Sequence, residues 1–467
     1  MSDPTRLSIA QAARAIRAKE ISPTELTEAY LARIEAHNPL INAYVTVTAE
    51  RARADAKAAQ DALAAGKDLG PLHGIPIGLK DLYETAGIRT TAGSKIFADN
   101  VPVADCPVAT KLREAGTILL GKTNTHEFAW GSTTNNPHWG PTRNPWMTDR
   151  IPGGSSGGSG AAIAACLAAG TMGTDTGGSI RMPAAACGCV GLKPTYGRVS
   201  KRDVFPMSYL YDHAGPITQT VEDAAIMLQV IAGYDALDPN SARVPVDDYT
   251  VQPRDGARGL RVAVLQGIFA EGIDAEILAA VNEAAKVLAG LGATLENVEP
   301  GFGREHTQAG FRAVFAETHS IHGDNWASRP QDFGADLQGI LQVPLPDARG
   351  VTDSISAASF IRAACQELLE RYDLLLVPTM PITAPPIAAE TVELNGKQVA
   401  TSGLLASLTM PFNLARLPVL AMPCGFSSEG LPMSISLVGR PFDEALVLRA
   451  GHAYEQATVW HTRRPAL

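Results

Sequence analysis

The chain has 467 residues, of which 45% are hydrophobic and 19% charged, with a formal net charge of -9 and a pI near 5.6. This composition can bury a large core, so fibrous and disordered classes are excluded. The acidic balance argues against a surface that neutralises phosphates, and we expect no nucleic-acid partner.

Location and redox state follow from three absences in the sequence. No stretch reaches the roughly 18 consecutive apolar residues of a membrane helix, and residues 1–20 carry charges where a signal peptide is apolar. The six cysteines are irregularly spaced, which is typical of reduced thiols. Cys187 and Cys189 form only a C-x-C, without the second cluster of a zinc site. We therefore expect a cytoplasmic protein with no membrane partner, no metal and no cofactor.

The predicted elements begin with helices and then alternate between strand and helix. Residues 22–25, Ser-Pro-Thr-Glu, combine an N-cap, a first-turn proline and a capping-box glutamate, and predict a helix over residues 26–36. The apolar residues 75–80 predict a strand that ends in a lysine. Further helices are predicted at residues 50–65, 108–115, 160–169, 275–291 and 359–372, and further strands at residues 117–120, 260–265, 374–377, 419–424 and 434–438.

This order of elements predicts an α/β fold with a mixed central β-sheet covered by helices on both faces. No Gly/Ser-rich or charged linker separates two halves of different composition. We therefore expect a single domain over residues 1–467.

A glycine- and serine-rich segment precedes an alanine-rich run. Residues 152–160 read Pro-Gly-Gly-Ser-Ser-Gly-Gly-Ser-Gly. Glycines let a backbone approach a ligand closely, and a helix N-terminus favours an anion, so a phosphate-binding loop is one interpretation. The segment lacks the lysine of a P-loop and the G-x-G-x-x-G spacing of a dinucleotide fold, which argues against a nucleotide. A flexible linker fits less well, because apolar elements flank the segment.

A second such segment, residues 173–181, reads Gly-Thr-Asp-Thr-Gly-Gly-Ser-Ile-Arg. It is not the G-x-S-x-G nucleophile elbow, because two glycines precede Ser179. It does present four successive backbone N–H groups that can curl around an oxyanion. These candidates belong to Thr176, Gly177, Gly178 and Ser179. Taken alone, a serine after two glycines is more often part of a turn.

Both segments, together with residues 74–81, Gly-Ile-Pro-Ile-Gly-Leu-Lys-Asp, resemble the amidase signature family. Other blocks that resemble this family are spread over nearly the whole chain, at residues 121–124, 140–146, 191–198, 212–216 and 421–423. The resemblance implies the amidase signature fold.

The resemblance also implies a role for three side chains. Ser179 is expected to be the acylated nucleophile, Ser155 a bridging serine on a cis peptide bond, and Lys80 the base. This chemistry needs no histidine, because burial at the end of an apolar strand makes a lysine neutral and basic. Without the resemblance, a lysine at a strand end is more often a solvated side chain.

The surroundings of these residues are expected as follows. Asp175 and Arg181 flank the nucleophile loop and hold it by hydrogen bonds. By resemblance, residues 1–65 form a helical N-terminal part, residues 70–220 the catalytic core, and residues 221–467 the rest of the sheet and a wall of the substrate pocket.

Three residues are expected to contact the substrate: the backbone at Ala129, Ser155, and Met182. Family members that read a substrate carboxylate can carry a basic residue where Met182 stands, so its thioether favours neutral, apolar or aromatic amides. Anilides, aliphatic amides and carbamates remain open, with ester cleavage as a side activity. Further candidates for an apolar wall are Phe128, Trp130, Phe205, Met207, Tyr209 and Tyr211. Arg416 stands where relatives usually have glycine, and either gates the pocket or reaches solvent.

We therefore expect a free-standing amidase that forms an acyl-enzyme on a small-molecule amide; a homodimer is left open. The alternative is the glutaminase subunit of the tRNA-dependent amidotransferase, which residues 454–458 resemble. That subunit typically has glutamine at the position of Met182, and its glutamine-recognition segment differs from residues 316–326 here. The alternative predicts a smaller partner chain and ammonia release from glutamine.

Overall fold

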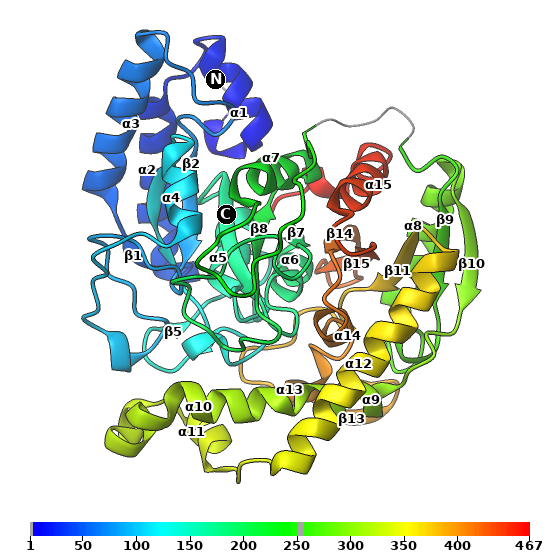
Figure 1. The fold of residues 1–467 in the computed structure, drawn as a ribbon. Coiled ribbons are helices and arrows are strands. Elements are labelled where there is room, and N and C mark those ends of the chain that lie inside the picture. The colour runs from blue at the N-terminus through cyan, green and yellow to red at the C-terminus, as the bar shows by residue number, and fades with distance from the viewer. Residues whose placement is uncertain (1–2, 251–255) are drawn as a thin grey trace.

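A mixed eleven-stranded sheet organises the structure, a computed structural model that describes residues 3–250 and 256–467 (Figure 1). The strands follow the order β1 (Tyr44–Val47), β3 (Ile118–Thr123), β2 (Pro76–Lys80), β6 (Gly170–Asp175), β8 (His213–Thr218), β7 (Val190–Lys193), β14 (Val419–Phe426), β15 (Pro432–Val438), β11 (Leu374–Pro378), β9 (Arg261–Leu265) and β10 (Thr294–Val298). Strands β3, β2 and β6 are parallel to one another, as are β11, β9 and β10, and the remaining pairs are antiparallel. The sheet therefore has a group of parallel strands at each end, and antiparallel strands join the two groups.

Helices cover the sheet on both faces, which confirms the predicted α/β class. They are α1 (Ile9–Arg17), α2 (Pro23–Ile41), α3 (Ala49–Ala64), α4 (Pro107–Glu114), α5 (Gly157–Ala164), α6 (Arg181–Cys187), α7 (Val221–Ile231), α8 (Ala275–Gly290), α9 (Arg304–Phe311), α10 (Ala313–Ser328), α11 (Ala335–Gln342), α12 (Ala348–Arg371), α13 (Thr401–Leu404), α14 (Met410–Leu414) and α15 (Glu444–Gln456). Helices α5 and α6 pack on each other and on the sheet, and so do α7 and α15. The single-domain assignment over residues 1–467 stays a prediction.

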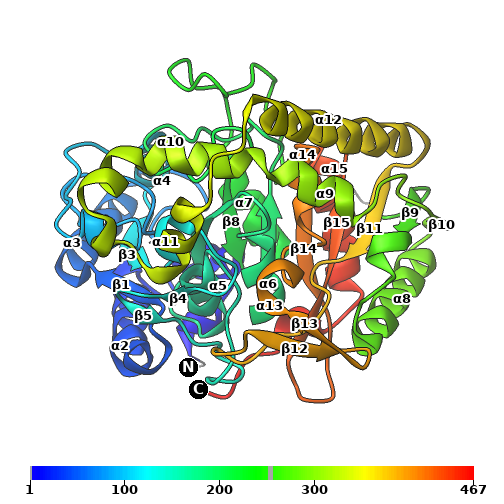
Figure 2. The ribbon, with the colours of Figure 1, turned by 90° about the horizontal axis from the view of Figure 1, so that it is seen from below.

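A separate layer is formed by the helices between β10 and β14. In Figure 1 helices α9, α10, α11 and α13 lie together below the sheet, and Figure 2 shows α9, α10 and α12 as a band along one side of the molecule. Two short hairpins complete the fold: β4 (Asn135–Asn136) with β5 (Gly140–Pro141), and β12 (Thr391–Leu394) with β13 (Lys397–Ala400). No helix among the described residues is long and apolar enough to cross a membrane.

The capping signal before α2 works as the sequence predicts. Ser22 Oγ accepts from the backbone N–H of Glu25, and the carboxylate of Glu25 accepts from the backbone N–H of Ser22. Together they satisfy donors that the first turn of a helix leaves open. The helix runs further than residue 36 and ends at Asn42, whose φ of 56° is the left-handed conformation that terminates helices.

Two predicted helix boundaries are wrong. The helix predicted at residues 359–372 begins at Ala348, because the polar stretch before residue 359 continues the helix on its exposed side. The helix predicted at residues 160–169 is α5, which begins at Gly157 and ends at Ala164. The glycines that look like a loop in the sequence therefore form the first turn of α5.

Gly158 is what allows α5 to begin where it does. Its backbone N–H donates to Asn124 O at 3.1 Å. A Cβ atom at this position would lie 2.4 Å from Asn124 N, 2.5 Å from Asn124 O and 2.6 Å from Ala43 O. These are backbone atoms of two other segments, so none of them can rotate away. The helix start is thus docked directly on the chain that follows β3.

We expect Gly158→Ala to destabilise the fold by about 3 kcal/mol or more, because overpacking against fixed backbone forces segments apart. The matched control is Gly323→Ala within α10, where an added Cβ has nothing within 4 Å. It should stabilise the fold by about 1 kcal/mol through helix propensity. The midpoint of thermal unfolding measures both. Equal midpoints for the two variants would contradict the docking role of Gly158.

Candidate active site

A cavity of about 410 Å³ lies between the sheet region and the helical layer, and Ser179 lines it. One side comes from the chain around Ser179, with Gly177 and Met182, and from residues 129–133. The other side comes from Phe311, Asp336, Ile340, Ser402, Ala406 and Met410. The cavity is therefore lined by segments far apart in the chain, between residues 126 and 410.

Lys80 is brought to Ser155 by the parallel pairing of β2 and β6. Lys80 ends β2 and Thr174 lies at the end of β6, and the carboxyl ends of parallel neighbours meet at one edge of a sheet. Lys80 Nζ donates to Ser155 Oγ at 2.7 Å and to Thr174 Oγ1 at 2.8 Å. Both Lys80 and Ser155 are fully buried, at 0% exposure. The ammonium is thus held by two neutral hydroxyl groups instead of water.

Ser155 lies just before α5, on a cis peptide bond with Gly154, as the family resemblance implies. Its carbonyl oxygen accepts from His126 N at 3.1 Å and from Thr134 Oγ1 at 3.2 Å. The next residue, Ser156, donates its backbone N–H to Ser179 O at 3.3 Å. The backbones of the two predicted catalytic serines are therefore adjacent. The hydroxyl of Ser179 has no hydrogen-bond partner among residues 3–250 and 256–467.

The loop that carries Ser179 holds four buried N–H groups without an acceptor. Within the described part of the chain, the backbone N–H groups of Thr176, Gly177, Gly178 and Ser179 donate to no protein atom. The next two N–H groups, of Ile180 and Arg181, both donate to Asp175 Oδ2. Unpaired buried N–H groups are rare in proteins, so a run of them beside a cavity is available to a ligand oxygen.

Asp175 and Arg181 hold this loop, as predicted. Arg181 Nη2 and Nε donate to the two carboxylate oxygens of Asp175 at 2.8 and 3.0 Å, and both side chains have 0% exposure. Asn413 Nδ2 donates to Asp175 Oδ1 at 2.7 Å. Although burial raises the pKa of Asp175, the Arg181 guanidinium holds that pKa well below its usual value. The bidentate pair therefore ties the loop to α14 without taking part in proton transfer.

The environment of Lys80 changes its acidity. Burial lowers the pKa of Lys80 from 10.5 to about 7, while the carboxylates of Asp212 and Asp175 act in the opposite direction. Near pH 7 a large fraction of Lys80 is thus neutral and able to accept a proton.

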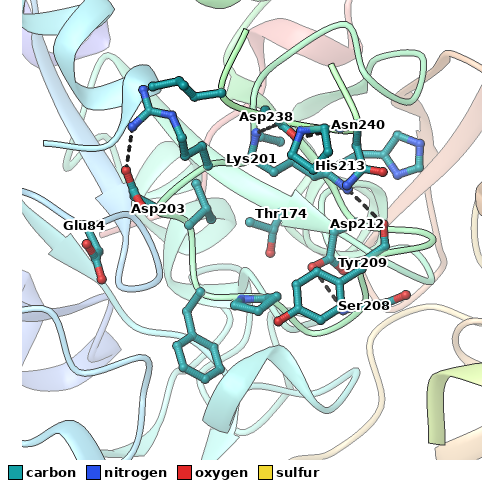
Figure 3. Close-up of a pocket in the computed structure, with 17 residues that line it drawn as sticks. Glu84, Thr174, Lys201, Asp203, Ser208, Tyr209, Asp212, His213, Asp238 and Asn240 are labelled. Atoms are coloured by element: carbon teal, nitrogen blue, oxygen red, sulfur yellow. Dashed lines mark hydrogen bonds and ion pairs between the residues drawn. The ribbon is translucent and has the colours of Figure 1, made fainter. Parts of the chain in front are cut away.

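A second cavity, of about 360 Å³, reaches Thr174 without containing Ser179 (Figure 3). Figure 3 shows Thr174 in the middle of its lining, with Lys201 and Asp212 nearby. Asp212 accepts from the backbone N–H groups of Met207 and Ser208 at 2.9 and 3.1 Å. Burial lowers the pKa of Lys201 to about 8, against the effect of Asp212 and Asp238. Of the charged side chains in this cavity, Asp212 acts on Lys80 and raises its pKa.

Two of the three predicted substrate contacts line the first cavity. Ala129 and Met182 are in its wall, whereas Ser155 lies behind it. Ala129 has a left-handed φ of 62°, next to Phe128 with a φ of 49°. Left-handed residues other than glycine are uncommon and cluster at functional sites.

The aromatic candidates divide between the cavity and the core. Trp130 and Met207 line the cavity. Phe128 and Phe205 pack on each other with ring centroids 4.8 Å apart. Neither these two nor Tyr209 and Tyr211 are part of the wall around Ser179.

Arg416 contacts Tyr196 and takes no part in the wall around Ser179. Its guanidinium lies 4.3 Å from the ring centroid of Tyr196, and it is not among the residues that line the Ser179 cavity. Its φ of 62° is left-handed, which agrees with glycine being usual at this position in the family. A cation–π contact with Tyr196 therefore occupies the side chain.

The sequence analysis missed Thr174, Asp336, Phe311 and Met410. Thr174 lies within residues 173–181, and its position at the end of a strand beside the lysine strand was the available signal. The other three come from the helical layer, where no local motif marks them. His126 also lines the cavity, and its Nε2 lies 3.1 Å from Asp336 Oδ2.

Comparison with known proteins identifies full-length relatives. A glutamyl-tRNA(Gln) amidotransferase subunit from Geobacter metallireducens is 40% identical over 97% of this chain and 97% of its own length. The solved structure of the corresponding subunit from Thermotoga maritima is 32% identical, has a TM-score of 0.79, and covers 98% of this chain and 96% of its own.

These relatives contradict the expectation of a free-standing amidase for neutral, apolar or aromatic amides. That expectation rested on Met182 and on residues 316–326. Both differences concern short stretches of the chain, whereas the likeness to these amidotransferase subunits extends over the whole length. The alternative, a glutaminase subunit of an amidotransferase, agrees better with the comparisons.

The expected partners are corrected by the same finding. From the sequence we expect a small-molecule amide as the partner and no nucleic acid, and we leave a homodimer open. These expectations do not match the relatives, which are named as one subunit of an enzyme that acts on a tRNA. Net charge is an average over the whole surface, and it says nothing of other chains in an assembly.

The family assignment rests on sequence and structure together. The family model described as Amidase matches residues 25–448. A solved structure of a vestigial protein complex, described as revealing the evolutionary origins of an s-triazine catabolic enzyme, is 37% identical, with a TM-score of 0.91 over 99% of this chain and 100% of its own. The chain belongs to the amidase signature family and is an amidase, an enzyme that acts on carbon–nitrogen bonds of amides.

Proposed function

We propose that this chain releases ammonia from glutamine as the glutaminase subunit of an amidotransferase that acts on glutamyl-tRNA(Gln). The likeness to such subunits over the whole length of both chains is the observation that supports this substrate and these partners. Other subunits and the tRNA are then its partners in place of a second copy of itself.

Ser179 is the nucleophile in this proposal. It lines the cavity, and its hydroxyl is free of protein partners among the described residues. Neutral Lys80 takes a proton from Ser155 Oγ while Ser155 takes the proton of Ser179, and Ser179 Oγ forms a bond to the amide carbon. Rotation of the Ser179 side chain on substrate binding brings its hydroxyl to Ser155, because catalytic hydrogen bonds often tighten only in the complex.

The oxyanion that forms is stabilised by the unpaired N–H groups of the loop from Thr176 to Ser179. The loop is fixed by the Asp175–Arg181 pair before the reaction begins. Donors that are already oriented need no reorganisation when charge develops, which is the main source of such stabilisation.

Collapse of the tetrahedral intermediate completes acylation. The proton held by Lys80 returns through Ser155 to the amide nitrogen, the carbon–nitrogen bond breaks, and ammonia leaves. Water then attacks the acyl-enzyme and gives its proton to the same relay, so that Ser179 is restored and glutamate is released. Protons and atoms balance without any further reactant.

The proposal predicts glutamine-dependent amidation of a tRNA. The tagged full-length chain, purified with its partners from its host cells, should convert glutamyl-tRNA(Gln) to glutaminyl-tRNA(Gln) in the presence of glutamine. Ser179→Ala should abolish this conversion, and ammonium chloride should restore it because the variant lacks only ammonia supply. Conversion by the purified assembly is measured as amide formed on labelled tRNA.

Two results would count against this function. One is an assembly that contains wild-type chain and forms no glutaminyl-tRNA from glutamine or ammonium. The other is unchanged glutamine-dependent conversion by Ser179→Ala.

Lys80 predicts the pH dependence of the hydrolysis. The base works in its neutral form, so kcat/KM should rise with pH through about 7 and level off above it. At pH 5 it should be about 100-fold below its plateau, because two pH units below its pKa only about one lysine in a hundred is neutral. Asp212 favours the charged form of Lys80, so Asp212→Asn should lower the pKa of Lys80 and shift the rise of kcat/KM to lower pH.

The control for that shift is Asp203→Asn. Asp203 lines the same second cavity as Asp212, but it pairs with Arg202 and does not act on Lys80. The pH profile of Asp203→Asn should match that of the wild-type chain. If the pH at which kcat/KM rises is unchanged in Asp212→Asn, or if the rise persists in Lys80→Met, a group other than Lys80 is titrating.

A further inference from the structure

The cavity around Ser179 holds one strongly acidic or basic side chain among its described lining residues, Asp336. Asp336 belongs to α11, and its side chain is 72% exposed. Met182, which follows Ser179 closely in the sequence, lines the same cavity and is uncharged. Charge recognition in this cavity therefore depends on α11.

His126 holds one oxygen of this carboxylate. Its Nε2 lies 3.1 Å from Asp336 Oδ2, and its Nδ1 lies 3.4 Å from Thr133 Oγ1. The ring fills the space above Gly131, where an added Cβ would lie 2.4 Å from it. The imidazole is thus fixed, and it fixes Asp336 in turn. Asp336 Oδ1 has no hydrogen-bond partner in the described part of the chain.

The start of α11 is anchored to the same loop that carries His126. Gly334 N donates to Glu127 Oε2 at 2.7 Å, and Glu127 Oε1 pairs with His138 Nε2 at 2.7 Å. Leu337 and Leu341 of α11 are buried. Asp336 is therefore held at the cavity by its backbone as well as by His126.

The rest of the wall is mostly apolar. It includes Trp130, Met182, Met207, Phe311, Ile340 and Met410. The side chain of Asp336 is 72% exposed, so water screens part of its attraction for a cation. An ammonium group that enters this cavity would still meet one carboxylate oxygen that is free to accept its hydrogen bond.

We propose that Asp336 binds a positively charged ammonium group of the amide substrate and so selects amides that carry one. The inference rests on the proposed function, since glutamine carries such a group on its α-carbon. It assigns the recognition of that group to a residue outside the nucleophile loop.

The test uses three amides of similar length and different charge: 5-aminopentanamide, which is a cation, pentanamide, which is neutral, and glutaramate, which is an anion. Wild-type full-length chain should show kcat/KM for the cation about threefold to fivefold above that for pentanamide, the effect of an ion pair with an exposed carboxylate. Asp336→Asn should remove this preference, and Asp336→Lys should transfer it to the anion.

The matched control is Asp353→Asn on α12. Its carboxylate is 71% exposed against 72% for Asp336, and it also has a single ion-pair partner, Arg349. It lies outside the cavity lining, so it should keep the wild-type preference. A loss of the preference in Asp353→Asn would show that general surface charge decides it, and would overturn the inference.

Binding gives a second readout that does not need turnover. Calorimetry with Ser179→Ala should show tighter binding of 5-aminopentanamide than of pentanamide, and the double variant Ser179→Ala, Asp336→Asn should bind both equally. Equal binding already in Ser179→Ala overturns the inference, and so does a uniform loss of kcat/KM for all three amides in Asp336→Asn, because a structural role predicts that pattern.

The outcomes separate this inference from the proposed function. If the cation is preferred through Asp336 while glutamine yields no ammonia, the inference holds and the proposed function fails. If glutamine is cleaved and Asp336→Asn leaves the charge preference unchanged, the proposed function holds and the inference fails.

Discussion

The burial of Lys80 is the constraint on which the candidate site depends. An ammonium removed from water must find other hydrogen-bond partners, and here they are the hydroxyls of Ser155 and Thr174. One comes from the start of α5 and the other from the end of β6, so the lysine joins two elements next to its own strand. The same burial brings its pKa to about 7, where the side chain can exchange a proton. The burial of Lys80 thus accounts both for its hydrogen bonds and for its lowered pKa.

A second buried charge gives the site its rigidity. The Asp175–Arg181 pair costs desolvation of two ions, and its geometry recovers part of that cost through bidentate hydrogen bonds. Asn413 of α14 joins the pair and links the loop of Ser179 to the C-terminal third of the chain. The loop is therefore held by this pair, while the N–H groups from Thr176 to Ser179 have no acceptor within residues 3–250 and 256–467. That division is what an oxyanion site requires.

A single side chain describes only part of the cavity around Ser179. Met182 describes the chemistry of one contact in the cavity, and it does predict an uncharged surface at that point. It says nothing about the other lining residues, which include the carboxylate of Asp336 from α11. Substrate class in an apolar cavity is set by a small number of polar groups, and these can come from any wall.

The sequence by itself determined the α/β class and most helices and strands, because capping signals and apolar periodicity act over short stretches of chain. The expected roles of Lys80, Ser155 and Ser179 came from the family resemblance. The sequence also indicated that Asp175 and Arg181 hold the loop of Ser179 by hydrogen bonds. Only the tertiary structure decided that the glycines at residues 157–158 form the first turn of α5, and that Asp336 lines the same cavity as Ser179. Both depend on the packing of segments far apart in the chain, which no local pattern encodes.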